Sequence, residues 1–239
     1  MKAAIFDLDD TLYNYRKIHP VAMERVFEYV QYNIGISKTD FNKAYEIGKK
    51  ITKENMSYDC ASQHNRIIYF QKTLEVLGMN PIKYTLALYD VYWNTMLELM
   101  QLNDGVIELL KYLRSKNIKI AICTDLTTHI QHRKLIKLEL VEYIDCLVTS
   151  EEAGLEKPNQ VMFNLCLEKL GVEANESFYI GDSFKKDILG AYYTGIIPIW
   201  LNEDNKIINE DNIGKYEEGQ NINDITNICK RLLENNDEE

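Results

Sequence analysis

The stretch Ala3–Leu12, which reads AAIFDLDDTL, decides most of the interpretation of this chain. The apolar run Ala3–Phe6 is followed at once by Asp7, Asp9, Asp10 and Thr11. A short apolar run of this kind is typical of a strand buried inside a parallel sheet. Open parallel sheets bind their ligands beyond the carboxyl ends of the strands. The polar residues directly after this run are therefore candidates for a functional site.

Further apolar runs of the same kind recur along the chain. They are Ile118–Cys123, Ile144–Val148, Phe178–Ile180 and Ile196–Leu201. Amphipathic helical patterns lie between most of these runs, so strands and helices alternate. The alternation predicts an α/β fold, with a Rossmann-like parallel sheet that carries helices on both faces.

Between Tyr15 and Trp93 the pattern is helical rather than strand-like. The expected helices are Val21–Tyr32, Thr39–Thr52, Cys60–Leu77 and Ile82–Leu99, separated in part by breaks at Asn55–Asp59 and Gly78–Pro81. We therefore expect an inserted all-helical cap domain at residues 15–93 and a core domain at residues 1–14 and 94–239. The acidic segment Glu234–Glu239 is expected to be solvated.

Composition narrows the class of protein. A chain of 239 residues with 46% hydrophobic residues can bury a substantial core, and its net charge of −10 argues against a nucleic acid polymer as partner. No apolar run approaches the roughly 20 residues that span a bilayer, and we expect neither a membrane partner nor a secretory signal at the N-terminus. The five scattered cysteines indicate a reducing compartment, so the expected location is cytoplasmic. The oligomeric state is left open.

Polar residues follow the other predicted strands as well. Thr124 and Asp125 follow the second strand, Lys157 lies in the loop after the third, and Asp182 follows the fourth. Clustered aspartates repel one another unless a hard cation lies among them, and Mg²⁺ prefers such oxygen ligands. A threonine hydroxyl can hold phosphoryl oxygens, and a lysine can stabilise the negative charge of a transition state. The pattern predicts a magnesium-dependent phosphoryl-transfer site.

The segments FDLDDTL, ICTD, EKP and GDSFKKD, in this order, resemble the four motifs of the haloacid dehalogenase-like superfamily. The resemblance implies that Asp7 attacks phosphorus and becomes transiently phosphorylated. It implies that Asp9 protonates the leaving group, later activates water and ligates Mg²⁺ through its backbone carbonyl. The expected substrate-binding residues are Thr11, Thr124, Asp125 and Lys157, and the expected metal site comprises Asp7, Asp9, Asp182 and Asp187.

Two longer segments, TSEEAGLEKPN and GDSFKKDILGAYYTGI, resemble the subgroup that contains pyrimidine 5′-nucleotidases and N-acylneuraminate-9-phosphatases. Motif two in that subgroup commonly reads Thr-Asn, whereas Asp125 follows Thr124 here. A further carboxylate near a phosphate is unfavourable unless it faces the metal, a cation or solvent.

The predicted function is hydrolysis of a small phosphate monoester, with a nucleoside 5′-monophosphate favoured and a sugar phosphate second. A phosphomutase shares all four motifs and stays open at this point. A 2-haloacid dehalogenase is disfavoured because those relatives lack the second aspartate. A non-catalytic, receiver-like phosphate-binding domain is disfavoured because receivers are shorter and have no helical insertion after the first strand.

Overall fold

The strand Ala3–Phe6 (β1) lies inside a parallel sheet in the computed structural model, which describes residues 1–56, 60–208 and 213–234. It pairs with β2 (Lys119–Thr124) on one side and with β4 (Ser177–Gly181) on the other. The six-stranded sheet has the order β3-β2-β1-β4-β5-β6. Its remaining strands are β3 (Cys146–Thr149), β5 (Ile197–Leu201) and β6 (Glu217–Gly219). This order brings the carboxyl ends of β2, β1 and β4 side by side.

The α/β fold predicted from the sequence is confirmed, and each predicted strand is present, with its ends matched or shifted by at most two positions. The three-residue strand β6 was not predicted, because its sequence Glu-Glu-Gly lacks the apolar run that marks the other strands. Part of the predicted break at Asn55–Asp59 and most of the acidic segment Glu234–Glu239 lie outside the described residues.

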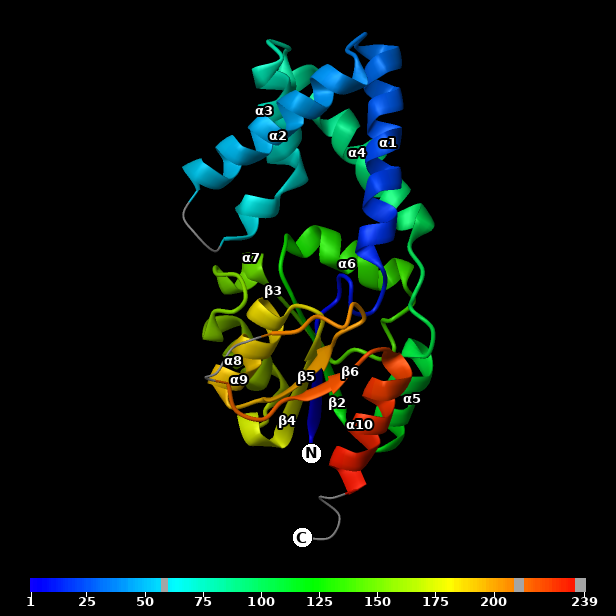
Figure 1. The fold of residues 1–239 in the computed structure, drawn as a ribbon, viewed down its shortest axis with the longest axis vertical. Coiled ribbons are helices and arrows are strands. Elements are labelled where there is room, and N and C mark those ends of the chain that lie inside the picture. The colour runs from blue at the N-terminus through cyan, green and yellow to red at the C-terminus, as the bar shows by residue number, and fades with distance from the viewer. Residues whose placement is uncertain (57–59, 209–212, 235–239) are drawn as a thin grey trace.

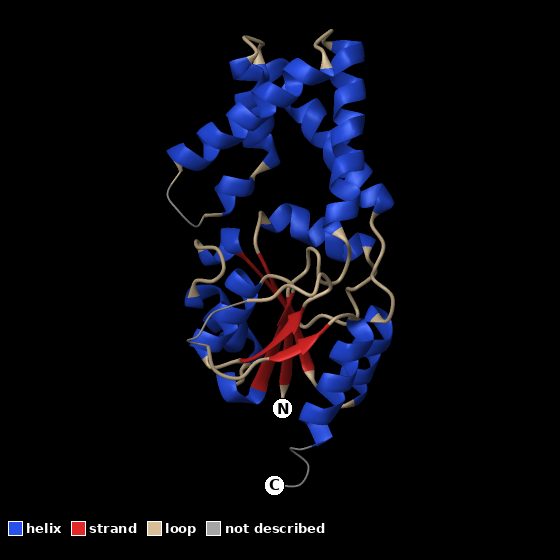
Figure 2. Ribbon diagram, viewed as in Figure 1, coloured by secondary structure: helices blue, strands red, loops and turns tan. Residues whose placement is uncertain are grey.

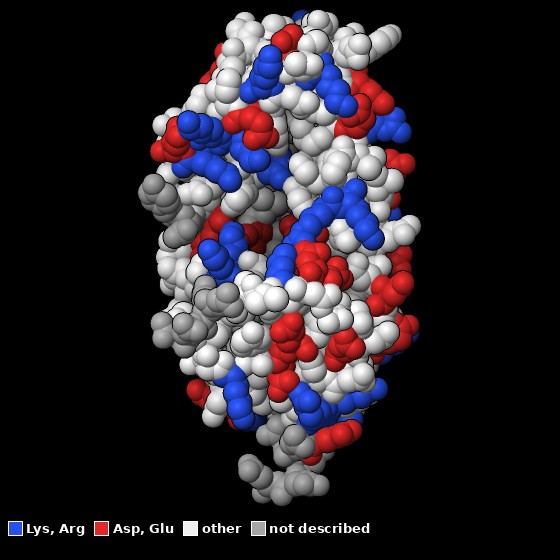
Figure 3. All heavy atoms as spheres, in the orientation of Figure 1, with Lys and Arg blue, Asp and Glu red and all other residues white. Residues whose placement is uncertain are grey.

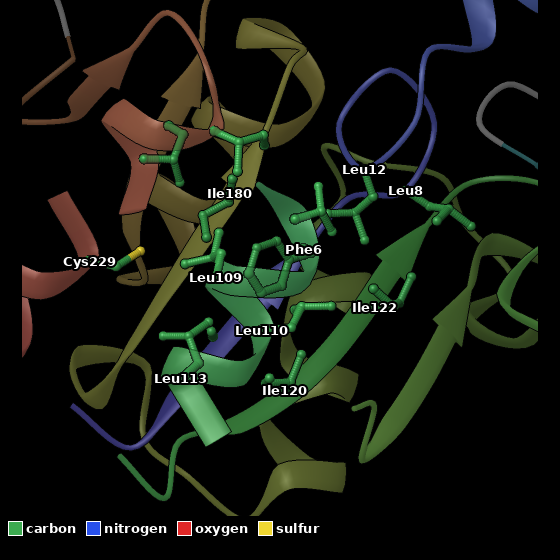
Figure 4. Close-up of a cluster of buried hydrophobic side chains, with 14 of the residues drawn as sticks. Phe6, Leu8, Leu12, Leu109, Leu110, Leu113, Ile120, Ile122, Ile180 and Cys229 are labelled. Atoms are coloured by element: carbon green, nitrogen blue, oxygen red, sulfur yellow. The ribbon is translucent and has the colours of Figure 1, made fainter. Parts of the chain in front are cut away.

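Helices cover both faces of the sheet, as alternating side chains along the strands require (Figures 1 and 2). Ala4 and Phe6 of β1 face α5 (Val106–Ser115) and α10 (Ile222–Glu234), where Leu109 and Leu110 complete the cluster in Figure 4. The other β1 residues, Ala3 and Ile5, face α8 (Gln160–Leu170) and α9 (Leu189–Thr194). The shorter elements are α6 (Thr128–Lys137), α7 (Ser150–Ala153), the 3₁₀ turns η1 (Ala61–His64) and η2 (Ala174–Glu176), and the π-helical turn η3 (Phe184–Ile188).

The inserted segment is helical throughout its described part. Its helices, called the cap helices below, are α1 (Tyr15–Asn33), α2 (Lys38–Asn55), α3 (Arg66–Val76) and α4 (Pro81–Leu99). The single helix expected at Cys60–Leu77 is instead η1 followed by α3, because the Asn65 side chain accepts a hydrogen bond from the Ile67 N–H and starts a new helix.

The cap helices have a hydrophobic cluster of their own, which includes Phe41, Phe70 and Trp93. Ile130 of α6 joins this cluster, so the cap rests on the helix that follows β2 (Figure 1). Helix α4 runs through position 93 to Leu99 before the chain re-enters the sheet layer. Within the described residues, we find no helix with the length and apolar character needed to cross a membrane.

Candidate active site

A cavity of about 230 Å³ lies between the strand ends and the cap helices. Its core wall includes Asp7, Thr124, Lys157 and Asp182, which come from four separate segments of the chain. The cap contributes further side chains, among them Tyr15, His64, Arg66 and Trp93. Figure 3 shows the hollow between the two parts, with acidic atoms in its depth. The fold therefore brings together residues that the sequence placed at separate strand ends.

Asp7 is held in a buried network of polar groups. Its Oδ1 accepts a hydrogen bond from Lys157 Nζ at 2.6 Å, and the same ammonium group lies 2.8 Å from Asp187 Oδ1. The Tyr179 hydroxyl donates to Asp187 Oδ1 at 3.0 Å. Burial raises the pKa of Asp7, and Lys157 opposes this shift. Burial alone would lower the pKa of Lys157, but Asp187 and Asp7 raise it well above its ordinary value, so the lysine is a cation. The network orients the Asp7 carboxylate and fixes a positive charge beside it.

The loop after β4 is shaped for close approach of Asp187. A Cβ atom on Gly181 would lie 2.4 Å from the Asp187 carboxyl carbon, so glycine is required there. Asp187 Oδ2 accepts the Ser183 N–H at 2.9 Å, and the chain forms the π-helical turn η3 directly afterwards. Such turns are frequent at functional sites. The Gly-Asp-Ser sequence thus turns Asp187 back toward Lys157 rather than out to solvent.

Three carboxylates converge at the bottom of the cavity. Ligand oxygens of Asp7, Asp182 and Asp187 lie within 4.8 Å of one another and could hold a metal ion. Burial, followed by the negative charges of Asp187 and Asp10, raises the pKa of Asp182 to about 7. A group of oxygen ligands that resists ionisation in the absence of a cation fits a hard divalent ion such as Mg²⁺. Arg16 Nη2 lies 2.7 Å from Asp182 Oδ2 and partly balances the group.

The carboxylate of Asp9 points to a different partner. Both of its oxygens accept hydrogen bonds from Lys134 Nζ, at 2.6 and 2.8 Å, and the Tyr13 hydroxyl donates to Oδ1. Lys134 is completely buried, and its ammonium lies 5.3 Å from the ring centre of Trp93 in α4. The Asp9 side chain lines the cavity but is not part of the carboxylate cluster of Asp7, Asp182 and Asp187. A cap residue, a core lysine and Asp9 are therefore in contact.

Thr124 and Thr11 are both buried, but they differ in their relation to the cavity. The Thr124 hydroxyl accepts a hydrogen bond from Gln131 Nε2 at 2.7 Å and donates one to the Asp125 backbone carbonyl at 3.3 Å, a long contact that a phosphoryl oxygen can replace. Thr124 lines the cavity. Thr11 is fully buried and its hydroxyl is 3.4 Å from Asp7 Oδ2, so it contacts the Asp7 carboxylate rather than lining the cavity.

Asp125, the departure from the Thr-Asn pattern, faces a cation. Its Oδ2 accepts from Lys186 Nζ at 2.7 Å, and its Oδ1 accepts the Lys157 backbone N–H at 3.0 Å. Lys186 also reaches Glu156 Oε2 at 3.1 Å. The added carboxylate thus faces a lysine of the GDSFKKD segment, shared with Glu156, which reduces the expected conflict with a bound phosphate.

Sequence reasoning missed Arg16, Gln131, Lys134 and Lys186. For Lys134 a signal was present, because it lies four positions after Ile130 in α6 and shares its buried side. A lysine at an apolar position of a helix indicates a buried partner of opposite charge. For Arg16, which pairs with acids as distant in sequence as Asp182 and Asp204, no local pattern gives the contact.

The sheet order, the four strand-end segments and the helical insertion define a class of α/β hydrolases. The family model described as haloacid dehalogenase-like hydrolase matches residues 4–201, and the chain belongs to this family. The activity named for its curated relatives is that of a phosphatase, and the chain is a hydrolase of this phosphatase type.

Three relatives illustrate the range of names. A ribulose-1,5-bisphosphate 5-phosphatase of Halopiger xanaduensis is 38% identical, over 81% of this chain and 82% of the relative. A glyceraldehyde 3-phosphate phosphatase of Methanocaldococcus jannaschii is 31% identical, over 97% of this chain and 98% of the relative. The pyrimidine 5′-nucleotidase YjjG of Escherichia coli is 30% identical, over 82% and 84%.

The subgroup resemblance is confirmed, because an N-acylneuraminate-9-phosphatase of Mus musculus is also a relative, at 24% identity over 87% of this chain and 85% of the relative. Among solved structures, a 2-haloacid dehalogenase of Pseudomonas syringae pv. Tomato has a TM-score of 0.77 at 20% identity, over 97% of this chain and 99% of that one. At that identity the likeness concerns the fold alone.

Proposed function

We propose that this protein hydrolyses small phosphate monoesters through a phosphoaspartyl intermediate on Asp7. The observation that supports this most directly is the setting of the Asp7 carboxylate. It lies in the wall of the cavity, where one of its oxygens accepts a hydrogen bond from Lys157 at 2.6 Å, and it belongs to the cluster of carboxylates that could hold a metal ion. A nucleophilic carboxylate needs an orienting group and a nearby positive charge to approach an anionic phosphate, and both are present.

In the proposed reaction each of these residues has a separate role. An oxygen of Asp7 attacks phosphorus, the bond to the ester oxygen breaks, and Asp9 gives its proton to that leaving oxygen. Thr124 and Lys157 donate hydrogen bonds to phosphoryl oxygens as charge develops there. Asp9 then takes a proton from water, whose oxygen attacks phosphorus, so that phosphate leaves and the Asp7 carboxylate is restored.

Asp7, Asp182 and Asp187, together with the Asp9 backbone carbonyl, are the residues that would hold Mg²⁺. When bound, the ion neutralises negative charge on the phosphate and so reduces its repulsion of Asp7. We further propose that residues 1–14 and 94–239 form the core domain, that residues 15–93 form the cap domain, and that the enzyme works in the cytoplasm, where its five unpaired cysteines would stay reduced.

The substrate is proposed to be small, because the cavity of about 230 Å³ is covered by the cap helices. A nucleoside 5′-monophosphate and a sugar phosphate both meet this condition. The relatives named for ribulose 1,5-bisphosphate and glyceraldehyde 3-phosphate favour the phosphorylated sugar, which we place ahead of the nucleotide.

The test is turnover of 4-nitrophenyl phosphate with and without Mg²⁺ by the wild type and by Asp7→Asn. The variant should lose activity and keep its fold, because an amide is nearly isosteric with a carboxylate but is a poor nucleophile. Asp10→Asn is the matched control, since Asp10 lies three positions after Asp7 and does not line the cavity, and its backbone φ of 60° is one that asparagine tolerates. Activity retained by Asp7→Asn, in protein free of deamidation, would refute the proposed nucleophile.

A further inference from the structure

The cap wall of the cavity contains a cation whose contacts with the described residues are all neutral. Arg66, the first residue of α3, lines the cavity and is half-buried. Its Nη2 donates to the Tyr15 hydroxyl at 2.6 Å, and its Nη1 donates to the His64 carbonyl at 2.9 Å. Its guanidinium carbon lies 5.2 Å from the ring centre of Tyr69 and 5.4 Å from that of Tyr92. Its Nε is inaccessible to solvent and has no hydrogen-bond partner among the described residues.

The other cations of the same cavity differ from Arg66. Lys157 is paired with Asp7 and Asp187, and Lys186 is paired with Asp125 and Glu156. Within residues 1–56, 60–208 and 213–234, no carboxylate forms an ion pair with Arg66.

The cap interior around Arg66 is electrostatically positive. His19 lies there, with its Nδ1 2.7 Å from the Tyr92 hydroxyl. Burial, and then the positive charges of Arg66 and Lys49, lower the pKa of His19 to about 4. A charge withdrawn from water without a counter-ion is costly, and proteins normally pair it. The counter-ion missing from the described residues can be supplied by a ligand in the cavity.

The position of Arg66 on the cap wall determines which part of a bound substrate it contacts. The transferred phosphoryl group belongs beside Asp7 and Thr124, on the core wall. Arg66 comes from the cap, so it faces the part of the substrate that leaves. We propose, building on the phosphatase function above, that Arg66 binds a second anionic group on the leaving part of the substrate. The preferred substrates are then phosphate esters that carry a further phosphate or a carboxylate.

The inference is tested by steady-state kinetics on matched esters in the presence of Mg²⁺. One pair compares ribulose 1,5-bisphosphate with ribulose 5-phosphate, and the other compares 3-phosphoglycerate with glycerol 3-phosphate. In each pair the second anion is the main difference, so the first pair reports a phosphate and the second a carboxylate. 4-Nitrophenyl phosphate, which has no second anion, reports the chemistry of the core alone.

In the wild type, kcat/KM should favour the doubly anionic member of at least one pair. Arg66→Gln should lower kcat/KM for that member by about 10- to 150-fold, the usual worth of a hydrogen bond to a charged group. The aryl phosphate should change by less than about threefold. Arg66→Lys keeps the charge but loses the planar fork, and should fall between wild type and Arg66→Gln. Lys50→Gln, which makes the same charge change on an exposed cap residue, should leave the preference intact.

If Arg66→Gln loses kcat/KM equally on every substrate, Arg66 has a structural role and the inference is overturned. The inference is also overturned if the wild-type enzyme hydrolyses the aryl phosphate but prefers neither doubly anionic ester to its singly anionic partner. If Arg66→Gln does not fold, the selective loss must appear in Arg66→Lys, and its absence there would also overturn the inference. Wild-type enzyme inactive on all five esters would instead refute the proposed phosphatase function, and the inference with it.

Discussion

Replacing Asp182 with asparagine tests the carboxylate cluster through stability as well as activity. Burial, with Asp187 and Asp10, raises the pKa of Asp182 from 3.8 to about 7. The metal-free folded protein therefore holds a proton on this group more tightly than the unfolded chain does. The stability that this group contributes is fully present below about pH 4 and is lost as the pH rises to about 7. Asparagine is neutral at every pH and avoids that loss.

The expected size follows from the difference between the two pKa values. With 1.36 kcal/mol for each pH unit, metal-free Asp182→Asn should be more stable than the metal-free wild type by up to about 4 kcal/mol at pH 8. The same relation gives an advantage of less than about 2 kcal/mol at pH 5. In a chain of this size 1 kcal/mol moves Tm by about 2–4 °C, so the difference at pH 8 is measurable by thermal unfolding.

Magnesium should stabilise the wild type more than it stabilises Asp182→Asn. A ligand at 100 times its Kd stabilises the folded state by about 2.7 kcal/mol, and this gain requires an intact site. The wild type should therefore gain Tm with Mg²⁺ and Asp182→Asn should gain little, with its hydrolysis of 4-nitrophenyl phosphate lost or shifted to higher Mg²⁺. Asp204→Asn is the control, because Asp204 also pairs with Arg16 but is exposed and outside the cluster. A wild-type response to Mg²⁺ in Asp182→Asn, or no stabilisation of the metal-free variant at pH 8, would refute the assignment of this cluster.

Three further outcomes are expected. Asp9→Asn should slow hydrolysis of an ester with a poor leaving group by about 10²- to 10⁴-fold and should slow hydrolysis of 4-nitrophenyl phosphate less. If Asp9→Asn hydrolyses the poor-leaving-group ester as fast as the wild type does, Asp9 is not the general acid. Lys134→Met removes the ammonium that donates hydrogen bonds to both Asp9 oxygens. It should lower kcat on the poor-leaving-group ester by about 10- to 100-fold. Lys137→Met, on the same helix, is the control. Ca²⁺ should inhibit competitively with Mg²⁺, since it takes more ligands at longer distances, and full activity in Ca²⁺ alone would contradict a site built for the smaller ion.

The fold was predictable because its signals are local. Each of the five predicted strands is an apolar run followed by polar residues, and the sheet order then places the ends of β1, β2 and β4 together. The candidate residues Asp7, Thr124, Lys157 and Asp182 follow from strand ends and loops in the same way, and they line one cavity. Local patterns failed where the structure has short polar elements, as in β6, or where a side chain starts a new helix, as Asn65 does.

Charge pairing could not be derived from the sequence, because it depends on contacts between distant segments. The carboxylate of Asp9 pairs with Lys134, which is 125 positions away, and Asp125 pairs with Lys186, which is 61 positions away. Sequence reasoning established that Asp125 needed a cation, metal or solvent. It could not choose among them, since the choice is made by the turn η3 that carries Lys186 back over the loop after β2.

The distribution of these pairs explains how a protein with a net charge of −10 can bind an anion. On the core wall, the carboxylates of Asp7, Asp182 and Asp187 lie close together and Lys157 is already paired with two of them, so without a metal this wall offers a phosphate little unpaired positive charge. A divalent cation in that cluster would supply positive charge to this wall, so under the proposed mechanism the metal is needed for substrate binding as well as for chemistry. On the cap wall, Arg66 has only neutral contacts among the residues that the structure describes, so its positive charge is available without a metal. The two walls thus attract anions by different means, and a substrate with an anionic group at each end matches both.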